Sequence, residues 1–370
     1  MSMIRITDKA RCCGCHACVG ACPWECIGMK EDAEGFLYPE ANPEHCIECG
    51  RCEEACPLIH TPEPPGTPRA FAAVSRDGAA RAASSSGGSF SLLAEKTLSR
   101  GGVVFGAAFD EAFEVRHTAA ETAAELSRLR GSKYVQSRIG DAYLRAEELL
   151  REGREVLFTG TPCQIAGLRT FLGRDYDNLS ALDIICHGVP SPRAWRRFLA
   201  CREREAESRA AAVSFRRKDE GWRRFSMAVA FENGAEYRKT FKEDPYLQSF
   251  LKDAISRPSC YDCAFKTLGR VSDITLADFW GVNKFLPALD DNKGTSLLLV
   301  HTPRGERMLD EIRDSLDLAE ADPADAVRYN QSATQSARTH PNRAAFLARA
   351  GREDPAALYR ELVFAAEEHA

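Results

Sequence analysis

Eight cysteines near the N-terminus fall into two runs that have the same spacing. One run begins at Cys12 and the other at Cys46, and each follows the pattern C-x2-C-x2-C-x3-C-P. Closely spaced thiolates in this pattern are ligands of 4Fe-4S clusters, because soft sulfur donors suit iron–sulfur cores. The second run repeats the first at a constant offset of 34 residues, so the pattern is an internal repeat as well as a motif.

In two-cluster ferredoxins, the fourth cysteine of each run binds the other cluster. The sequence therefore predicts two crossed ligand groups. The first cysteine group is Cys12, Cys15, Cys18 and Cys56. The second cysteine group is Cys46, Cys49, Cys52 and Cys22. Zinc is the competing metal, but zinc sites usually use two separated CxxC pairs. We interpret Cys13 and Cys26, which lie outside the pattern, as packed small residues.

The composition favours a protein of the reducing cytoplasm. Fifteen cysteines in 370 residues could form a disulfide scaffold, but such scaffolds are usually short and secreted. The N-terminus has no apolar signal segment, and no apolar run is long enough to span a membrane. The net charge of −5 argues against non-specific nucleic-acid binding.

The negative charge is concentrated in the cysteine-rich part. Residues 1–68 hold 5 Lys/Arg against 11 Asp/Glu, whereas the remainder holds 44 against 43. This acidic part could steer a basic redox partner, or it could be an ordinary solvated surface.

The chain divides at a proline-rich segment. We expect a ferredoxin-like domain at 1–60, a semi-rigid linker at 61–68 and a larger domain at 69–345, followed by a C-terminal helix at 346–370. Alternating apolar strands and helices in the larger domain predict an α/β fold with a mixed sheet.

Two stretches of the larger domain stand apart from that alternation. Residues 211–241 predict antiparallel strands, with Asn233-Gly234 as a hairpin turn. The basic tip formed by 216–218 and 222–224 could contact a phosphate or another anion, or could be a solvated hairpin. The segment from about residue 304 is expected to be mostly helical.

Four further cysteines could form a third site. Two follow predicted strands and two form a CxxC pair; this third cysteine group is Cys163, Cys186, Cys260 and Cys263. Converging thiolates would bind another 4Fe-4S cluster or a structural zinc. The alternative is an isolated CxxC with two buried thiols. The remaining Cys201 has no supporting context.

Several motifs of the larger domain occur together in one known family. They are Ser84-Ser-Ser-Gly-Gly-Ser-Phe90, Gly131-Ser-Lys-Tyr-Val-Gln-Ser137, Gly160-Thr-Pro-Cys-Gln-Ile165, Cys186-His-Gly-Val-Pro-Ser-Pro192, Cys260-x2-Cys263 and Asp273-Ile-Thr-Leu-Ala-Asp-Phe-Trp-Gly281. In this order they closely resemble the coenzyme F-420 hydrogenase/dehydrogenase beta-subunit family, over about residues 69–345. An N-terminal two-cluster ferredoxin domain is a common attachment in that family.

The resemblance implies an FAD-binding α/β domain with a further 4Fe-4S cluster held by the third cysteine group. It also implies a set of FAD-binding residues: Ser85, Ser86, Gly87, Gly88, Ser89, Ser132, Lys133, Tyr134, Gln136, Ser137 and Thr161. Relatives reduce or oxidise the deazaflavin F-420, and a plant branch reduces a chlorophyll derivative. His187 and Lys133 are candidates for a proton donor or a neighbour of flavin N1. His187 could equally fix the loop that holds Cys186.

These observations favour an iron–sulfur flavoprotein oxidoreductase with three 4Fe-4S clusters and FAD. It would transfer a hydride to or from coenzyme F-420 or another organic substrate. The alternatives are a non-catalytic electron-transfer subunit of a larger redox complex and a binding protein stabilised by zinc. A redox partner protein or ferredoxin is expected, within a homo-oligomer or a complex.

Overall fold

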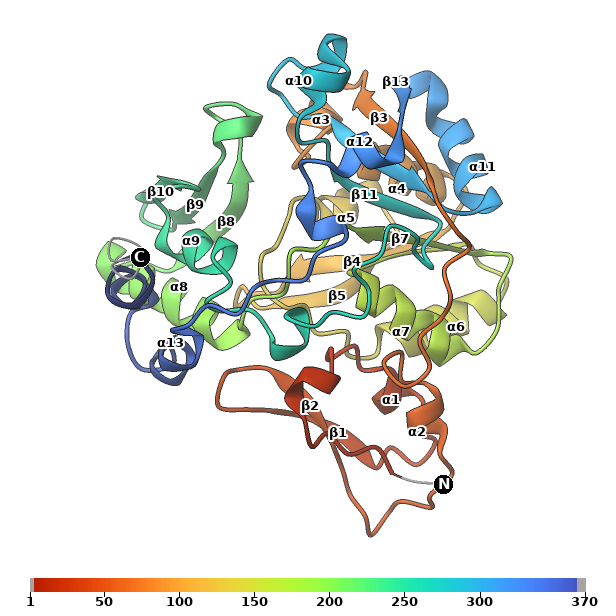
Figure 1. Ribbon diagram of the computed structural model, residues 1–370, viewed down its shortest axis with the longest axis vertical. Helices are drawn as coiled ribbons and strands as arrows, with labels where there is room; N and C mark the ends of the chain where they lie inside the picture. The colour runs from red at the N-terminus through yellow and green to blue at the C-terminus, as the bar shows by residue number, and fades with distance from the viewer. Residues whose placement is uncertain (1–2, 365–370) are drawn as a thin grey trace.

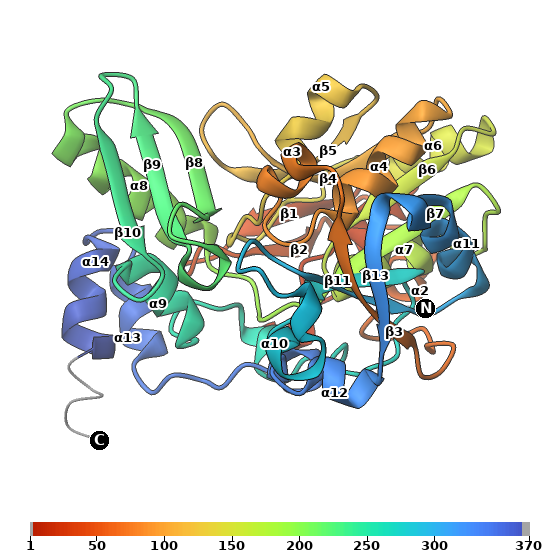
Figure 2. The same ribbon diagram turned by 90° about the horizontal axis from the view of Figure 1, so that it is seen from above.

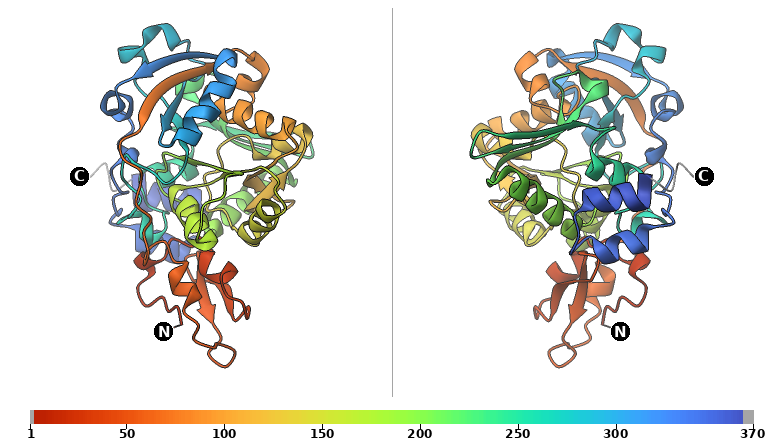
Figure 3. Two further views of the ribbon diagram at one scale, coloured as in Figure 1. Left: turned by 90° about the vertical axis from the view of Figure 1, so that its right-hand side faces the viewer. Right: turned by 90° about the vertical axis from the view of Figure 1, so that its left-hand side faces the viewer.

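A computed structural model describes residues 3–364 and shows a small N-terminal unit below a larger body (Figure 1). We call residues 3–60 the ferredoxin module. Its strands β1 (Ile27–Glu31) and β2 (Leu37–Ala41) pair antiparallel. Its short helices α1 (Ala17–Gly20) and α2 (Arg51–Glu54) lie within the two cysteine runs. The side views show the module projecting from one end of the molecule (Figure 3).

A mixed eight-stranded sheet forms the centre of the larger body. Its order is β13-β3-β12-β11-β7-β6-β4-β5, with parallel pairing between β11, β7, β6 and β4 and antiparallel pairing elsewhere. The strands are β3 (Arg69–Ser75), β4 (Val103–Phe109), β5 (Val115–Ala120), β6 (Val156–Thr159), β7 (Leu179–Ile184), β11 (Ile274–Asp278), β12 (Ser296–Val300) and β13 (Leu316–Ala321). This architecture confirms the predicted mixed-sheet α/β class.

Helices cover both faces of this sheet because the side chains of each strand alternate between the faces. On β6, Val156 and Phe158 pack with α6 and α7, whereas Leu157 packs with α4 and α11 on the opposite face. The helices of these layers are α4 (Ser89–Ser99), α5 (Ala123–Leu126), α6 (Ala142–Arg151), α7 (Pro162–Leu172) and α11 (Pro303–Ile312). Strands buried on both faces explain the apolar runs in the sequence.

A second sheet stands beside the first, as the view from above shows (Figure 2). Its strands β8 (Ala210–Arg217), β9 (Ser226–Phe231) and β10 (Glu236–Thr240) pair antiparallel, as predicted. They share a core with α8 (Pro192–Ala206), α9 (Pro245–Leu251), α13 (Arg343–Arg349) and α14 (Pro355–Leu358). Shorter helices elsewhere are α3 (Gly78–Ala82), α10 (Val282–Phe285) and α12 (Pro323–Val327).

The structure departs from the expected C-terminal region in two places. The segment after residue 304 is not all helical, because β13 pairs with β3 at the edge of the main sheet. In place of one helix over 346–370, α13 and α14 are separate and a π-helical turn follows at Tyr359–Phe364. Pro355 begins α14, where its fixed φ suits a helix start but not a helix interior. Residues 365–370 of the expected helix lie outside the described residues.

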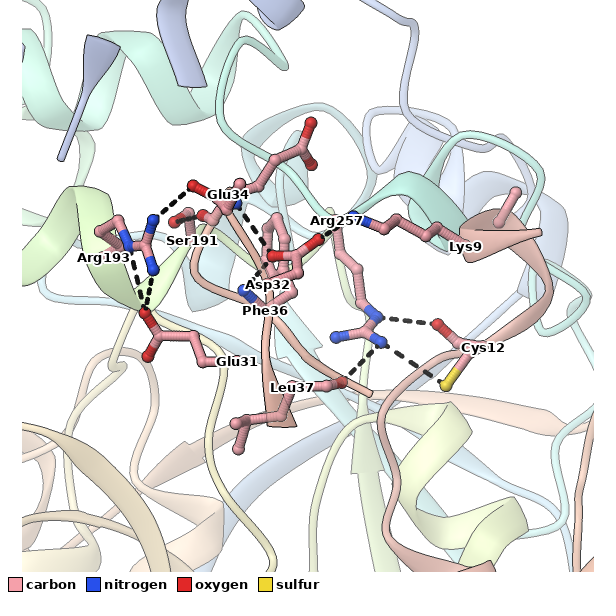
Figure 4. A network of polar contacts seen from close by, with 12 residues as sticks. Lys9, Cys12, Glu31, Asp32, Glu34, Phe36, Leu37, Ser191, Arg193 and Arg257 are labelled. Atoms are coloured by element: carbon pink, nitrogen blue, oxygen red, sulfur yellow. Dashed lines mark hydrogen bonds and ion pairs between the residues drawn. The ribbon is translucent and has the colours of Figure 1, made fainter. Parts of the chain in front are cut away.

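The ferredoxin module docks on the larger body through buried polar contacts (Figure 4). Arg257 inserts its guanidinium between the Cys12 loop and β2, and Arg193 bonds Glu31 and the Ala33 carbonyl. Helix α7 supplies a third contact, in which the Thr170 hydroxyl donates to the Ala55 carbonyl at 2.7 Å. Because several partners are buried, the module is held in one orientation and is not merely tethered by the linker.

No helix within residues 3–364 combines the length and apolar character that crossing a membrane requires.

Gly167 allows α7 to approach the first cysteine run. A Cβ atom at this position would lie 2.9 Å from Cys15 Sγ and 3.2 Å from the Tyr143 hydroxyl. We therefore expect Gly167→Ala to cost about 1–3 kcal/mol through overpacking, although alanine favours a helix by about 1 kcal/mol. The temperature of thermal unfolding measures the effect. Gly78→Ala in α3, where nothing lies within 4 Å, is the control, and equal unfolding temperatures for the two variants would contradict this account.

Candidate metal centres and cofactor cavity

Two small cavities in the ferredoxin module collect the cysteines in the crossed arrangement expected from the sequence. One cavity is lined by Cys12, Cys15, Cys18 and Cys56, together with Cys13. The other is lined by Cys22, Cys46, Cys49 and Cys52, together with Cys26. Each helical turn inside a run follows a residue with positive φ, His16 in one and Gly50 in the other, and this backbone bend wraps the thiols around the cavity.

The third cysteine group gathers because two strand ends and one loop meet. Strands β6 and β7 are parallel neighbours, so the segments after them, which carry Cys163 and Cys186, leave the same edge of the sheet. The segment before Cys260 then pairs with the segment after Cys186, through bonds from Ser191 to Ile255 and from Arg257 to Val189. The structure thus brings together four cysteines that lie up to 100 residues apart.

Charge interactions among these thiols also report their proximity. Burial raises the pKa of Cys186 to about 12, and Cys163 and Cys263 add to the rise. The neighbouring Cys13 thiol and burial raise the pKa of Cys163, while the charge of Arg257 opposes that rise. Thiols in this environment keep their protons until a metal replaces them.

Within residues 3–364, no three His, Cys, Asp or Glu side chains lie close enough together to hold a single metal ion. Charge interactions link Cys186 and Cys260 to the other thiols of the group, and four thiolates are the ligand set of a 4Fe-4S cubane.

Two cysteines that the sequence pattern left out lie at these centres. Cys13 is half-buried, with its thiol beside those of Cys15 and Cys163, and so lies between the first and third cysteine groups. Cys26 Sγ lies 3.3 Å from Cys22 Sγ in the second group. The adjacent pair Cys12-Cys13 is the only hint in the sequence, because the meeting of Cys13 with Cys163 is created by tertiary folding.

A large cavity of about 1180 Å³ opens between the main sheet and the hairpin of β8 and β9. Its walls come from 74–85, 127–133 and 213–221, with additional residues near 109–113, 292–293 and 317. Nine lining side chains are cationic and two are carboxylates: Arg76, Arg81, Arg128, Arg130, Lys133, Arg216, Arg217, Lys218 and Lys293, against Asp219 and Asp317. Of the basic hairpin tip, residues 216–218 line the cavity, as the anion-binding alternative expected, whereas 222–224 are absent from its walls.

Lys133 and Lys218 are the cations best placed to receive an anion. The Lys133 ammonium donates to the carbonyls of Arg128 and Arg130, both at 2.8 Å, and burial lowers its pKa to about 7. Burial likewise lowers the pKa of Lys218 to about 8. Several of the arginines, by contrast, already pair with carboxylates, as Arg76 does with Asp317. A bound anion would stabilise the charged form of both lysines.

The residues expected to bind FAD separate into two sets. Ser85, Ser132 and Lys133 line the cavity, and the Ser132 amide and hydroxyl donate to Ser85 Oγ at 2.9 and 3.0 Å. The other eight are absent from its walls: Ser86, Gly87, Gly88, Ser89, Tyr134, Gln136, Ser137 and Thr161.

The eight residues outside the walls have structural surroundings of their own. Gly87 packs against β3 and β12, where a Cβ would lie 2.4 Å from the Ala73 carbonyl. Gln136 bonds the Cys13 carbonyl in the ferredoxin module, and Ser137 bonds His117. Thr161 caps α7 beside Cys163.

His187 lies beside the third cysteine group and is not part of the cavity wall. Its Nε2 lies 2.9 Å from Asp253 Oδ1, and its Nδ1 lies 3.2 Å from Ser332 Oγ. Lys266 also bonds the Cys186 carbonyl. This placement favours a role in fixing the Cys186 loop.

Aromatic side chains connect that loop to the cavity. Tyr134, adjacent to Lys133, packs on Phe250 with ring centroids 5.2 Å apart, and Phe250 meets the His187 ring at 4.9 Å. The third cysteine group and the cavity therefore belong to one continuously packed region.

Comparisons with known proteins agree with this geometry. Residues 11–58 match the 4Fe-4S dicluster domain family, and residues 153–326 match the family described as the C terminus of the coenzyme F420 hydrogenase/dehydrogenase beta subunit. The first of these matches identifies the ferredoxin module as a 4Fe-4S dicluster domain. Over residues 153–326, the larger domain is similar to the coenzyme F420 hydrogenase/dehydrogenase beta-subunit family, which confirms the resemblance predicted from the sequence.

Curated relatives match the chain over short stretches, about as long as the ferredoxin module. The module is 42% identical over 56 residues to NADH-quinone oxidoreductase subunit I 2 of Geobacter metallireducens (14% of this chain, 43% of the relative). It is 40% identical over 53 residues to Ferredoxin-1 of Caulobacter vibrioides (14% and 42%). The chain thus spans less than half the length of these relatives. A structure of the F420-reducing [NiFe] hydrogenase complex from Methanosarcina barkeri aligns with a TM-score of 0.47 and 15% identity, over 83% of this chain and 96% of that one.

Proposed function

We propose that this protein is an iron–sulfur flavoprotein oxidoreductase that holds FAD in the cationic cavity. The observation that carries the proposal is the cavity itself, which is large enough for a dinucleotide and whose charged lining residues are mainly cations. Ligand pockets usually measure about 300–1,000 Å³, so this one exceeds the size that a small metabolite needs. The substrate would be coenzyme F-420 or another organic hydride donor or acceptor.

The lining residues suit the two chemical parts of FAD. Lys133 would hold the pyrophosphate through the N–H that its two carbonyl partners leave over. Lys218, which donates to three carbonyls, would add positive charge beside it. Phe109, Phe113 and Phe215 supply apolar wall for a ring system. When bound, FAD supplies the conversion between one-electron and two-electron transfer. Lys133 remains our candidate for the flavin neighbour, whereas His187 acts on the Cys186 loop.

All three cysteine groups are proposed to hold 4Fe-4S clusters. The second group lies at the outer end of the ferredoxin module, the first lies against α7, and the third lies beyond Cys13. This order forms a path from the exposed tip towards the cavity. Because none of the fifteen cysteines, all within the described residues, forms a disulfide, a reducing cytoplasm is the proposed compartment.

One observation favours the second candidate function, an electron-transfer subunit of a larger complex. Trp24 and Ile47, which line the second cysteine cavity, have 62% and 57% of their surface exposed. Exposed apolar side chains beside a redox centre suit contact with a partner protein. We propose that a one-electron carrier protein docks here, whether the chain acts alone or as a subunit.

Anaerobic purification followed by iron, sulfide and flavin analysis tests the proposal. We expect roughly twelve irons and one FAD per chain, since each cubane contains four irons. Iron without flavin would favour the electron-transfer subunit, and zinc in place of iron would reject both functions.

Replacing one ligand of the third group should remove one cluster. We expect Cys163→Ala to lose about four irons per chain while the two ferredoxin-type clusters remain, because a cubane needs its thiolates. Iron analysis with electron paramagnetic resonance measures this loss. Cys201→Ala, a buried cysteine of α8, is the matched control. Full iron content in Cys163→Ala would remove Cys163 from the ligands.

Flavin binding should weaken as the pH rises. Burial places the pKa of Lys133 at about 7 and that of Lys218 at about 8. Both ammonium groups are charged below these values and neutral above them, whereas the pyrophosphate keeps its charge. We expect the Kd for FAD to increase between pH 6 and pH 9.

The variant Lys133→Gln should flatten this pH dependence. At pH 6 its Kd should be about tenfold higher, since a hydrogen bond to a charged group contributes about 1.5–3 kcal/mol, and by pH 9 the difference should shrink. Fluorescence titration measures both curves. Lys30→Gln, which removes an exposed partner of Glu40 in the ferredoxin module, serves as the control. Parallel curves for the wild type and Lys133→Gln would contradict the role of this lysine.

A further inference from the structure

Arg257 of the larger body is fully buried against the first cysteine group. It has 0% of its surface exposed, although it belongs to the segment between α9 and Cys260 and not to the ferredoxin module. Its Nε donates to the Cys12 carbonyl at 2.8 Å, and one terminal nitrogen lies 3.6 Å from Cys12 Sγ. Figure 4 shows the guanidinium pointing at this cysteine. A buried cation thus contacts both the backbone carbonyl and the sulfur of Cys12, a proposed cluster ligand.

The remaining contacts of Arg257 leave its charge uncompensated. The same terminal nitrogen donates to the Leu37 carbonyl at 2.9 Å, and the other donates to Gln136 Oε1 at 3.0 Å. The guanidinium also lies over the Tyr38 ring, 4.2 Å from its centroid. These partners are neutral, and arginine stays protonated in proteins. A fixed positive charge therefore faces the first cysteine group in a setting where water screens it little.

The second cysteine group has a different electrostatic environment. The segments 23–25 and 43–54, which surround it, contain five glutamates and one arginine. Cys46 Sγ accepts a hydrogen bond from a backbone amide, that of Glu48, at 3.4 Å. Cluster potentials depend on net charge, on hydrogen bonds to the sulfurs and on exposure. The surrounding charge therefore favours an electron at the first group over one at the second.

We infer that Arg257 is a positioning residue that raises the reduction potential of the cluster in the first cysteine group above that of its partner in the second. Reduction adds one electron, and therefore one negative charge, with no bond formed or broken. The buried guanidinium stabilises the reduced form more than the oxidised form. An electron that enters from a one-electron carrier at the exposed second group then settles at the first group, next to Cys13 and Cys163. The inference rests on the proposed ligand assignment.

A redox titration followed by electron paramagnetic resonance on the anaerobically purified full chain tests this inference. In Arg257→Gln, we expect one of the one-electron waves to move to lower potential. The reduction equilibrium should shift by about tenfold, which is about 59 mV for a one-electron couple. The wave of the cluster in the second group should stay where it is, and that of the third group should shift less, since the Arg257 charge reaches it only at Cys163.

Two further variants make the test decisive. In Gln136→Glu, a carboxylate of nearly the same shape as the amide contacts the Arg257 guanidinium and offsets its charge. The same wave should therefore shift to lower potential. This variant keeps Arg257, so it tests the inference even if Arg257→Gln folds poorly. Arg193→Gln is the control, because it removes interface bonds to Glu31 and Ala33 without touching a sulfur. Its waves should match those of the wild type.

Unchanged waves in both Arg257→Gln and Gln136→Glu would overturn the inference. An equal shift of all waves, or loss of about four irons from both variants, would assign Arg257 to holding the module together instead. Iron analysis of the same wild-type sample separates failure of the ligand assignment from failure of the inference. Fewer than about eight irons per chain would reject the proposed clusters, whereas full iron with unmoved waves would reject only the role of Arg257.

Discussion

The close docking of the Cys12–Cys18 loop on the larger body is the contact on which the arrangement of centres depends. Arg257 enters this loop from one side, and the glycine face of α7 approaches it from the other. Helix α7 begins at the turn that carries Cys163, and it passes Cys15 only one turn further along. One helix and one arginine therefore set the separation between the first and third cysteine groups. Without them, the proline-rich linker alone would leave that separation variable.

The charge of the surroundings changes from negative at the outer cysteine group to positive at the large cavity. Carboxylates surround the outer cysteine group, a buried cation faces the inner one, and cations dominate the wall of the large cavity. Each step inwards therefore moves towards more positive surroundings, which favours the arrival of electrons and the binding of an anionic cofactor. This order of charges depends on residues of the ferredoxin module, on Arg257 and on the cavity wall. It is therefore a property of the assembled fold and not of any single motif.

The sequence predicted those elements whose defining residues are close together in the chain. The cysteine runs and the buried strands β3, β6 and β12 were recognisable because their ligands or apolar residues are adjacent in the sequence. Strand β13 was missed because its sequence, Leu-Asp-Leu-Ala-Glu-Ala, is rich in helix-forming residues. Its strand conformation is imposed by pairing with β3, and its charges suit the sheet edge that it occupies.

The candidate site was harder to predict because tertiary contacts create it. Nothing near Arg257 in the sequence indicates a buried cation, and Cys13 becomes informative only once α7 places Cys163 beside it. The cavity likewise draws on segments more than 100 residues apart. The family resemblance identified two loops that meet there, at Ser85 and Ser132. It did not distinguish the residues that line the cavity from those that support it.

Anomalous diffraction at the iron absorption edge, from crystals grown without oxygen, tests the central claim most directly. We expect three iron sites, with two in the ferredoxin module and the third among Cys163, Cys186, Cys260 and Cys263. The site at Cys12 should lie between the other two. Two iron sites alone, or a third site away from these four cysteines, would contradict the proposed path from the module to the cavity.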